Sequence, residues 1–286
     1  MPKVAIITDS NSGITPAVAK ELGCFVLPMP FEIDGQTYYE EVNLSQDEFY
    51  NKLMNNAEVF TSQPVVGDIS KLWNEVLKTY DEIVHIPMSS GLSGSCQTAL
   101  MLAEEYDGKV EVANTQRISV TQEQDVLDAL AYAKAGKSAK EIKDLLEDHK
   151  MNASIYITVN TLEYLAKGGR LTPAVAKLGG MLKIKPILTI QGEKLDTFSK
   201  SRTMTKAGKI MIDAIKKDIK NRFDDDPSSV QLNVAYTYDL DAALEYKKEV
   251  EEAFPGQQVN VAPLSLSVSC HIGPNSLALA IAKKYN

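Results

Sequence analysis

Apolar positions in the first half of the chain fall into short runs separated by amphipathic stretches. The runs at residues 4–7, 82–87 and 109–113 have the length and composition of strands that are buried on both faces. Residues 68–80 instead carry apolar side chains at helical spacing, and residues 123–134 and 138–150 predict two further helices. This alternation predicts a parallel sheet covered by helices on both sides.

The pattern changes near residue 152, where a predicted hairpin and a long helix follow. We expect strands at residues 153–159, 230–236 and 258–263 and a hairpin at residues 186–198. We expect helices at residues 161–167, 203–223, 240–254 and 274–284, of which the second is long and the last closes the chain. The expected α/β fold therefore has an N-terminal three-layer domain with a parallel sheet, residues 1–152. A smaller C-terminal α/β domain with a mixed sheet, residues 153–286, completes it.

Composition and charge narrow the classes of function. The chain has 286 residues, of which 44% are hydrophobic and 24% charged, as in a soluble globular protein. Its formal net charge of -8 argues against binding to the phosphate backbone of nucleic acids. No apolar stretch approaches the roughly 18–20 residues that span a bilayer, and the apolar run at residues 4–7 is too short for a signal peptide. We therefore expect no stable membrane insertion.

The cysteine and histidine residues give little support for a metal site. Three cysteines, Cys24, Cys96 and Cys270, are too few for a disulfide framework and are typical of the reducing cytoplasm. Cys270 is followed by His271, but no further cysteine or histidine stands at metal-ligand spacing. We expect a cytoplasmic protein with neither a metal nor a cofactor.

Three segments offer hydroxyl, amide and imidazole groups without a neighbouring lysine or arginine. Residues 89–95 hold four serines and two glycines, follow a predicted strand and open a helix. Ligands bind at the carboxyl ends of strands in such sheets, and helix N-termini there suit anions. Residues 61–64 form a second hydroxyl cluster, and residues 269–274 place His271 in a loop before the closing helix. Together these groups can bind a small carboxylate by hydrogen bonds, while an apolar tail would lie in the core.

Seven short segments occur in an order that resembles the DegV family, and together they extend over nearly the whole chain. They are residues 6–10, 61–64, 89–95, 167–170, 184–187, 202–207 and 271–274. The resemblance implies a long-chain fatty acid in a buried tunnel, with its carboxylate near the domain junction. It assigns the carboxylate contacts to Thr61 and Ser93, with His271 close by and with Ser62 and Gly94 in the same two loops.

The resemblance also implies a partner. The chain is similar to the acyl-binding subunit, FakB, of bacterial fatty acid kinase, which is not itself the catalyst. A separate ATP-binding subunit phosphorylates the carboxylate while the acyl chain stays bound, and the acyl phosphate feeds phospholipid synthesis. Arg170 and Arg202 match basic positions of the family near the ligand mouth or the partner surface.

Two positions depart from the family pattern. Asn114 and Thr115 stand where the family usually has Asp-Ser, and Cys96 replaces a residue that is commonly aromatic. These departures leave the local loop shape and the preferred acyl chain length open.

Two other functions are compatible with the same residues. Residues 91–95 differ from the GxSxG motif of serine hydrolases only at the last glycine, so Ser93, His271 and Asp9 could form a catalytic triad. The chain could also be a binding module for another apolar acid or lipid.

Overall fold

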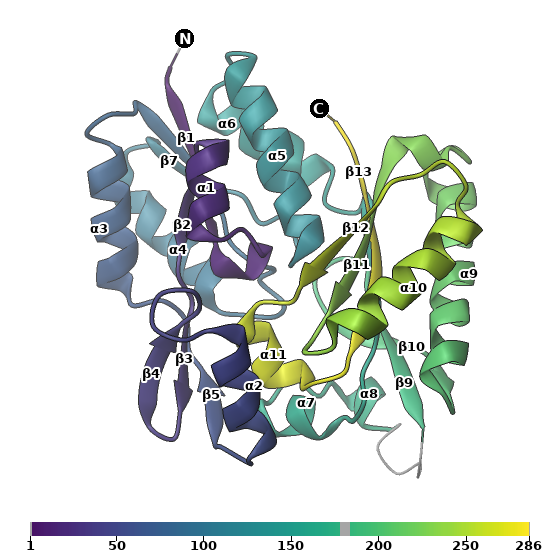
Figure 1. Cartoon of the computed structure of the whole chain (residues 1–286). Helices are drawn as coiled ribbons and strands as arrows, with labels where there is room; N and C mark the ends of the chain where they lie inside the picture. The colour runs from purple at the N-terminus through teal and green to yellow at the C-terminus, as the bar shows by residue number, and fades with distance from the viewer. Residues whose placement is uncertain (1, 178–183, 286) are drawn as a thin grey trace.

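The computed structural model describes residues 2–177 and 184–285 and arranges them as two main sheets flanked by helices (Figure 1). A third, small sheet of three strands lies beside them. Within the described residues, no helix is long and apolar enough to cross a membrane.

The first main sheet has four parallel strands in the order β2-β1-β6-β7, which confirms the predicted parallel sheet. These strands are β1 (Val4–Asp9), β2 (Phe25–Leu27), β6 (Glu82–Ile86) and β7 (Val110–Val112). Neighbouring residues of β1 enter different cores, because Ile6 packs beneath α1, α5 and α6 and Ile7 packs beneath α3 and α4. The helices are α1 (Pro16–Leu22), α3 (Val66–Val76), α4 (Ser95–Ala103), α5 (Val120–Lys134) and α6 (Ala139–Asp148). The sheet is thus the middle of three layers.

The small sheet follows β2 and has the order β4-β3-β5. The Asp34-Gly35 pair, a typical two-residue hairpin turn, joins β3 (Pro30–Ile33) to β4 (Gln36–Tyr39). The sequence pattern did not reveal β5 (Val59–Thr61) or α2 (Gln46–Met54), which opens with a capping box at Ser45. This unit packs against α11 (Leu266–Ile272).

The second main sheet has six strands in the order β10-β9-β8-β13-β11-β12. All neighbouring pairs are antiparallel except β11 and β12, which confirms the predicted mixed sheet. Its strands are β8 (Ala153–Thr158), β9 (Lys185–Ile190), β10 (Leu195–Ser201), β11 (Val230–Tyr236), β12 (Val259–Pro263) and β13 (Leu277–Lys283). Helices α9 (Met204–Arg222) and α10 (Leu240–Ala253) cover one face.

The opposite face of the six-stranded sheet packs against the first half of the chain. Ile155 and Ile157 of β8 share a core with Met29, Met88 and Val120, which come from the region of the parallel sheet. All strands of the parallel sheet precede residue 152 and all strands of the mixed sheet follow it. The division into domains 1–152 and 153–286 agrees with this order and stays a prediction.

Two predictions about the C-terminal end are wrong. Residues 274–284 do not form a helix, because Leu277–Lys283 is the strand β13 between β8 and β11. Leu279 and Ile281 face α9 while Ala278 and Ala280 face the other core, so burial on both sides gives an unbroken apolar run. Residues 269–274, which were expected to be a loop, are helical up to residue 272, because they overlap α11 (Leu266–Ile272), whose N-cap is Ser265.

Candidate functional site

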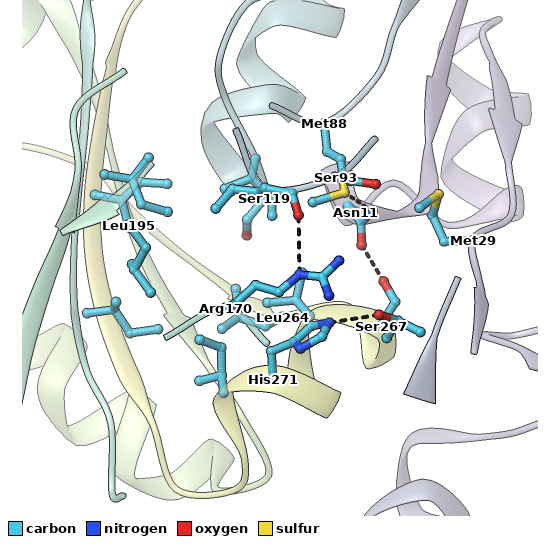
Figure 2. Close-up of a pocket in the computed structure, with 18 of the residues that line it drawn as sticks. Asn11, Met29, Met88, Ser93, Ser119, Arg170, Leu195, Leu264, Ser267 and His271 are labelled. Atoms are coloured by element: carbon cyan, nitrogen blue, oxygen red, sulfur yellow. Dashed lines mark hydrogen bonds between the residues drawn. The ribbon is translucent and has the colours of Figure 1, made fainter. Parts of the chain in front are cut away.

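A cavity lies between the mixed sheet and the loops that end β5 and β6 (Figure 2). Its volume of about 230 Å³ far exceeds the roughly 10–15 Å³ that one water molecule needs. The predicted contacts Thr61, Ser62, Ser93, Gly94 and His271 all line this one cavity. They come from segments up to 210 residues apart in sequence.

Most of the remaining cavity wall is apolar. Sixteen of its twenty-six lining residues are aliphatic or methionine, and they come from the core that joins both halves of the chain. These are Met29, Met88, Leu92, Ile118, Val120, Ile155, Ile157, Leu165, Ile190, Leu195, Ala235, Leu264, Val268, Ile272, Ala278 and Ala280. Figure 2 shows His271, Ser93 and Asn11 at one side of the cavity and Leu195 at the other. The cavity therefore has a polar end and a long apolar wall, as an amphiphilic ligand requires.

His271 lies on the last turn of α11 and contacts Thr61. Its Nε2 atom is 2.8 Å from Thr61 Oγ1, whereas the buried Nδ1 atom has no hydrogen-bond partner among the described residues. Burial, and then the positive charge of Arg170, lower the pKa of His271 to about 4. The imidazole is therefore neutral at pH 7, and the polar end holds hydrogen-bonding groups beside a single arginine charge.

Gly168 sets the position of the imidazole. A Cβ atom at Gly168 would lie 2.0 Å from His271 Nδ1, which is far inside van der Waals contact. The glycine of this segment therefore lets the histidine ring pack on the backbone after α7 (Glu163–Lys167). The ring is held between Gly168 on one side and Thr61 at Nε2.

Ser93 stands in the loop between β6 and α4, as expected for a ligand contact at the carboxyl end of a parallel strand. Its Oγ atom accepts a hydrogen bond from the backbone N–H of Ser95 at 3.2 Å. The hydroxyl hydrogen remains available, because no described group accepts it. Ser93 can therefore donate to an anionic oxygen in the cavity.

The two predicted arginines differ in position. Arg170 lines the cavity and donates from Nη1 to the carbonyl oxygen of Gly168 at 2.8 Å. It also lines a neighbouring hollow together with Lys194. Arg202 is exposed, directly precedes Thr203, the N-cap of α9, and is not part of the cavity wall.

The sequence did not single out three further polar residues of the cavity, namely Asn11, Ser119 and Ser267. Asn11 Oδ1 accepts hydrogen bonds from the hydroxyls of Ser265 and Ser267, and Asn11 Nδ2 lies 2.9 Å from Met88 Sδ. Asn11 directly follows the family-like segment at residues 6–10, and this position could have identified it as a candidate site residue. Its partners on α11 are more than 250 residues away, and no local pattern could have identified them.

Asp9 has a structural role that does not suit a catalytic triad. Its Oδ2 atom accepts from the backbone N–H of Met88 at 2.7 Å and its Oδ1 atom from that of Asn11 at 2.9 Å. Burial raises the pKa of Asp9 to about 6. Within the described residues, His271 is bonded to Thr61 and has no carboxylate partner. The arrangement proposed for a serine hydrolase is therefore not formed.

Comparisons with known proteins agree with this geometry. A family model described as an uncharacterised protein of the DegV family matches residues 3–284. A DegV domain-containing protein of Halalkalibacterium halodurans is 31% identical over 283 residues, which cover 98% of this chain and 98% of that protein.

Two solved structures have the same fold. A DegV family protein from Thermus thermophilus, described as fatty acid binding, has a TM-score of 0.89 and 27% identity, covering 99% of this chain and 100% of that one. DegV of Bacillus subtilis, described as a fatty acid binding protein, has a TM-score of 0.88 and 26% identity, with the same coverage.

Proposed function

The chain belongs to the DegV family, and from this premise we propose that it binds a long-chain fatty acid in the cavity. The carboxylate lies at Thr61, Ser93 and His271, with Ser62 and Gly94 beside them, and the acyl chain runs along the apolar wall. The observation that carries this proposal is the meeting of these hydroxyl and imidazole groups at one end of a mainly apolar cavity. The two similar structures described as fatty acid binding support it.

The chemistry of the polar end suits a carboxylate that must stay reactive. Thr61 and Ser93 supply neutral hydroxyls, and His271 is neutral at pH 7. A bidentate arginine pair would hold a carboxylate more tightly and would draw charge from both oxygens. Here Arg170 already donates to Gly168 and Leu92 carbonyl oxygens, so neutral hydrogen bonds provide much of the recognition.

We also propose that this protein presents the carboxylate to a separate ATP-binding kinase subunit and is not itself the catalyst. Arg202 supports this part, because it is exposed and, within the described residues, makes no hydrogen bond or ion pair. An arginine directly before the N-terminus of α9 is unfavourable to the helix dipole, so a local structural benefit is absent. Arg202, and Arg170 from its place beside the second hollow, are the proposed contacts to the kinase and its phosphates.

The test is to extract lipid from the purified native protein and identify it by mass spectrometry. We expect a stoichiometric fatty acid, or uptake of added palmitate or oleate by the delipidated protein. Ser93→Ala should weaken binding by about 1.5–3 kcal/mol, which is the usual contribution of a hydrogen bond to a charged group. A protein that neither contains nor takes up a fatty acid would refute the proposal, and hydrolysis of an ester substrate would favour the hydrolase instead.

A further inference from the structure

The turn between β9 and β10 contacts the serine loop, residues 89–95, directly. The buried hydroxyl of Ser89 donates to the backbone carbonyl oxygen of Glu193 at 2.8 Å. A Cβ atom at Gly91 would lie 2.3 Å from the same oxygen, so the two backbones meet where no side chain fits. The β9–β10 turn of the mixed sheet is thus in close backbone contact with the loop that carries Ser93.

Ser89 also holds the backbone around Ser93. Its carbonyl oxygen accepts from the N–H groups of Leu92 at 3.0 Å and Ser93 at 3.2 Å. Its Oγ atom accepts from the N–H of Gly91 at 3.3 Å while it donates to Glu193. A shift of Ser89 therefore shifts the backbone of Ser93, and one hydroxyl joins that backbone to the turn.

Asn114 completes the contact from the parallel sheet. Its Nδ2 atom donates to Ser90 Oγ at 2.9 Å, and Ser90 Oγ donates to Glu193 Oε1 at 3.2 Å. An aspartate at position 114 could not donate this hydrogen bond when ionised. The asparagine that departs from the family pattern therefore has a local role, which is to orient Ser90 toward Glu193.

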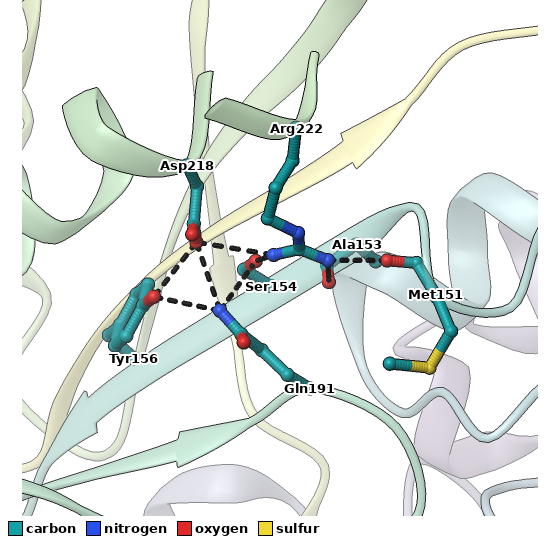
Figure 3. Close-up of polar contacts among 7 residues, drawn as sticks. All are labelled: Met151, Ala153, Ser154, Tyr156, Gln191, Asp218 and Arg222. Carbon is teal, nitrogen blue, oxygen red and sulfur yellow. Dashed lines mark hydrogen bonds and ion pairs between the residues drawn. The ribbon is translucent and has the colours of Figure 1, made fainter. Parts of the chain in front are cut away.

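The turn is anchored on its other side by Gln191 (Figure 3). Gln191 Nε2 lies 2.8 Å from Tyr156 Oη and 3.1 Å from Asp218 Oδ2. Tyr156 Oη itself donates to Asp218 Oδ2 at 2.8 Å, and Arg222 pairs with the same carboxylate at 3.4 Å. This network joins the turn to β8 and α9, so the mixed sheet presents Glu193 from a fixed position.

We propose that Ser89 is a positioning residue for fatty acid binding, which acts by fixing Ser93 against the β9–β10 turn. The inference rests on the proposed function, because it assigns Ser93 to the carboxylate. Ser89 does not line the cavity, so its effect is transmitted through the loop backbone. Its role is to hold the head-group contact at a set distance from the part of the apolar wall that the mixed sheet supplies.

The experiment compares palmitate with 1-hexadecanol, which has the same chain length and no carboxylate. Delipidated wild type, Ser89→Ala and the control Ser70→Ala are titrated with both lipids. Ser70 also donates its hydroxyl to a backbone carbonyl, that of Val66, but lies in α3 away from the cavity. We expect Ser89→Ala to raise the Kd for palmitate roughly fivefold to tenfold and to leave hexadecanol nearly unchanged. Ser70→Ala should change neither.

A double-mutant cycle supplies the second readout. If Ser89 acts through Ser93, the Ser89→Ala change should add almost nothing in a Ser93→Ala background. The inference would be overturned if Ser89→Ala weakened the binding of palmitate and hexadecanol equally. It would also be overturned if Ser89→Ala weakened palmitate binding as much in the Ser93→Ala background as in wild type. Wild type that fails to bind palmitate would refute the proposed function instead.

A second variant keeps the test valid if Ser89→Ala does not fold. Gln191 has an exposed side chain, and Gln191→Ala loosens the turn while Tyr156, Asp218 and Arg222 keep their mutual contacts. It should raise the palmitate Kd in the same selective way by a smaller factor. An unchanged preference for palmitate over hexadecanol in this folded variant would contradict the proposed link.

Discussion

Replacing Gly168 by alanine should displace His271 from Thr61. The new Cβ atom would lie 2.0 Å from Nδ1, 2.7 Å from Cε1 and 3.2 Å from Cγ of the imidazole. These distances require the ring to move by more than 1 Å, because carbon and nitrogen atoms in contact are about 3.5 Å apart. The Gly168 φ of -79° is one that alanine adopts freely, so the strain comes from the contact and not from the backbone.

The expected magnitudes follow from that contact. Overpacking of this kind costs about 1–3 kcal/mol of unfolding free energy. A ring that moves away also loses its 2.8 Å hydrogen bond to Thr61 and opens the polar end of the cavity. Loss of one hydrogen bond near a carboxylate should weaken palmitate binding by about 1.5–3 kcal/mol, or roughly 10- to 150-fold.

Urea unfolding and palmitate titration, each in two backgrounds, measure these effects. In a His271→Ala background the ring is absent, so Gly168→Ala should cost little stability there. Gly67→Ala is the matched control, because nothing lies within 4 Å of the Cβ position at Gly67 in α3. If Gly168→Ala costs the same stability with and without the imidazole, the contact is not the cause and the reasoning fails.

Two further predictions concern pH and the partner. Since the pKa of His271 falls from its ordinary 6.5 to about 4 on folding, its stabilising contribution is complete above pH 6.5 and is lost as the pH falls toward 4. Wild type should lose about 2 kcal/mol relative to His271→Gln between pH 7 and pH 5 in ligand-free urea titrations, and parallel curves would show that the histidine is not buried as described. Arg202→Ala should retain palmitate binding and slow acyl phosphorylation by the cognate kinase at limiting kinase. Joint loss of ligand and phosphorylation would instead place Arg202 at the carboxylate, and unchanged phosphorylation would make it ordinary surface charge.

The main features of the fold could be predicted because they depend on local patterns. The apolar run of β1 reflects burial of that strand on both faces. The amphipathic spacing of α3 reflects burial of that helix on one face. The segment at β13 misled the prediction, since Leu277–Lys283 combines alanine with leucine and isoleucine. Alanine favours helices in isolation, but the position between β8 and β11 overrides that preference.

The candidate site was predictable only in part. Ser93 stands out because its serine-rich loop follows a predicted strand, Thr61 because it opens a second hydroxyl cluster, and His271 because it was expected in a loop. The structure brings all three into one cavity even though His271 belongs to α11. The roles of Ser89 and Gly168 could not be predicted, because they depend on contacts with residues about one hundred positions away.

The cavity requires both halves of the chain, and this limits how its ligand can be held. Thr61 and Ser93 come from the residues before position 152, whereas His271 and much of the apolar wall come from those after it. Hydrogen bonds to the proposed carboxylate would depend on sub-ångström positions, whereas burial of an acyl chain depends mainly on area. A small relative shift of the two halves would therefore weaken carboxylate recognition before it weakens acyl burial. If the proposed function is correct, contacts that fix the halves to each other, such as Ser89 with Glu193 and Thr61 with His271, should set the selectivity for an acid over other lipids.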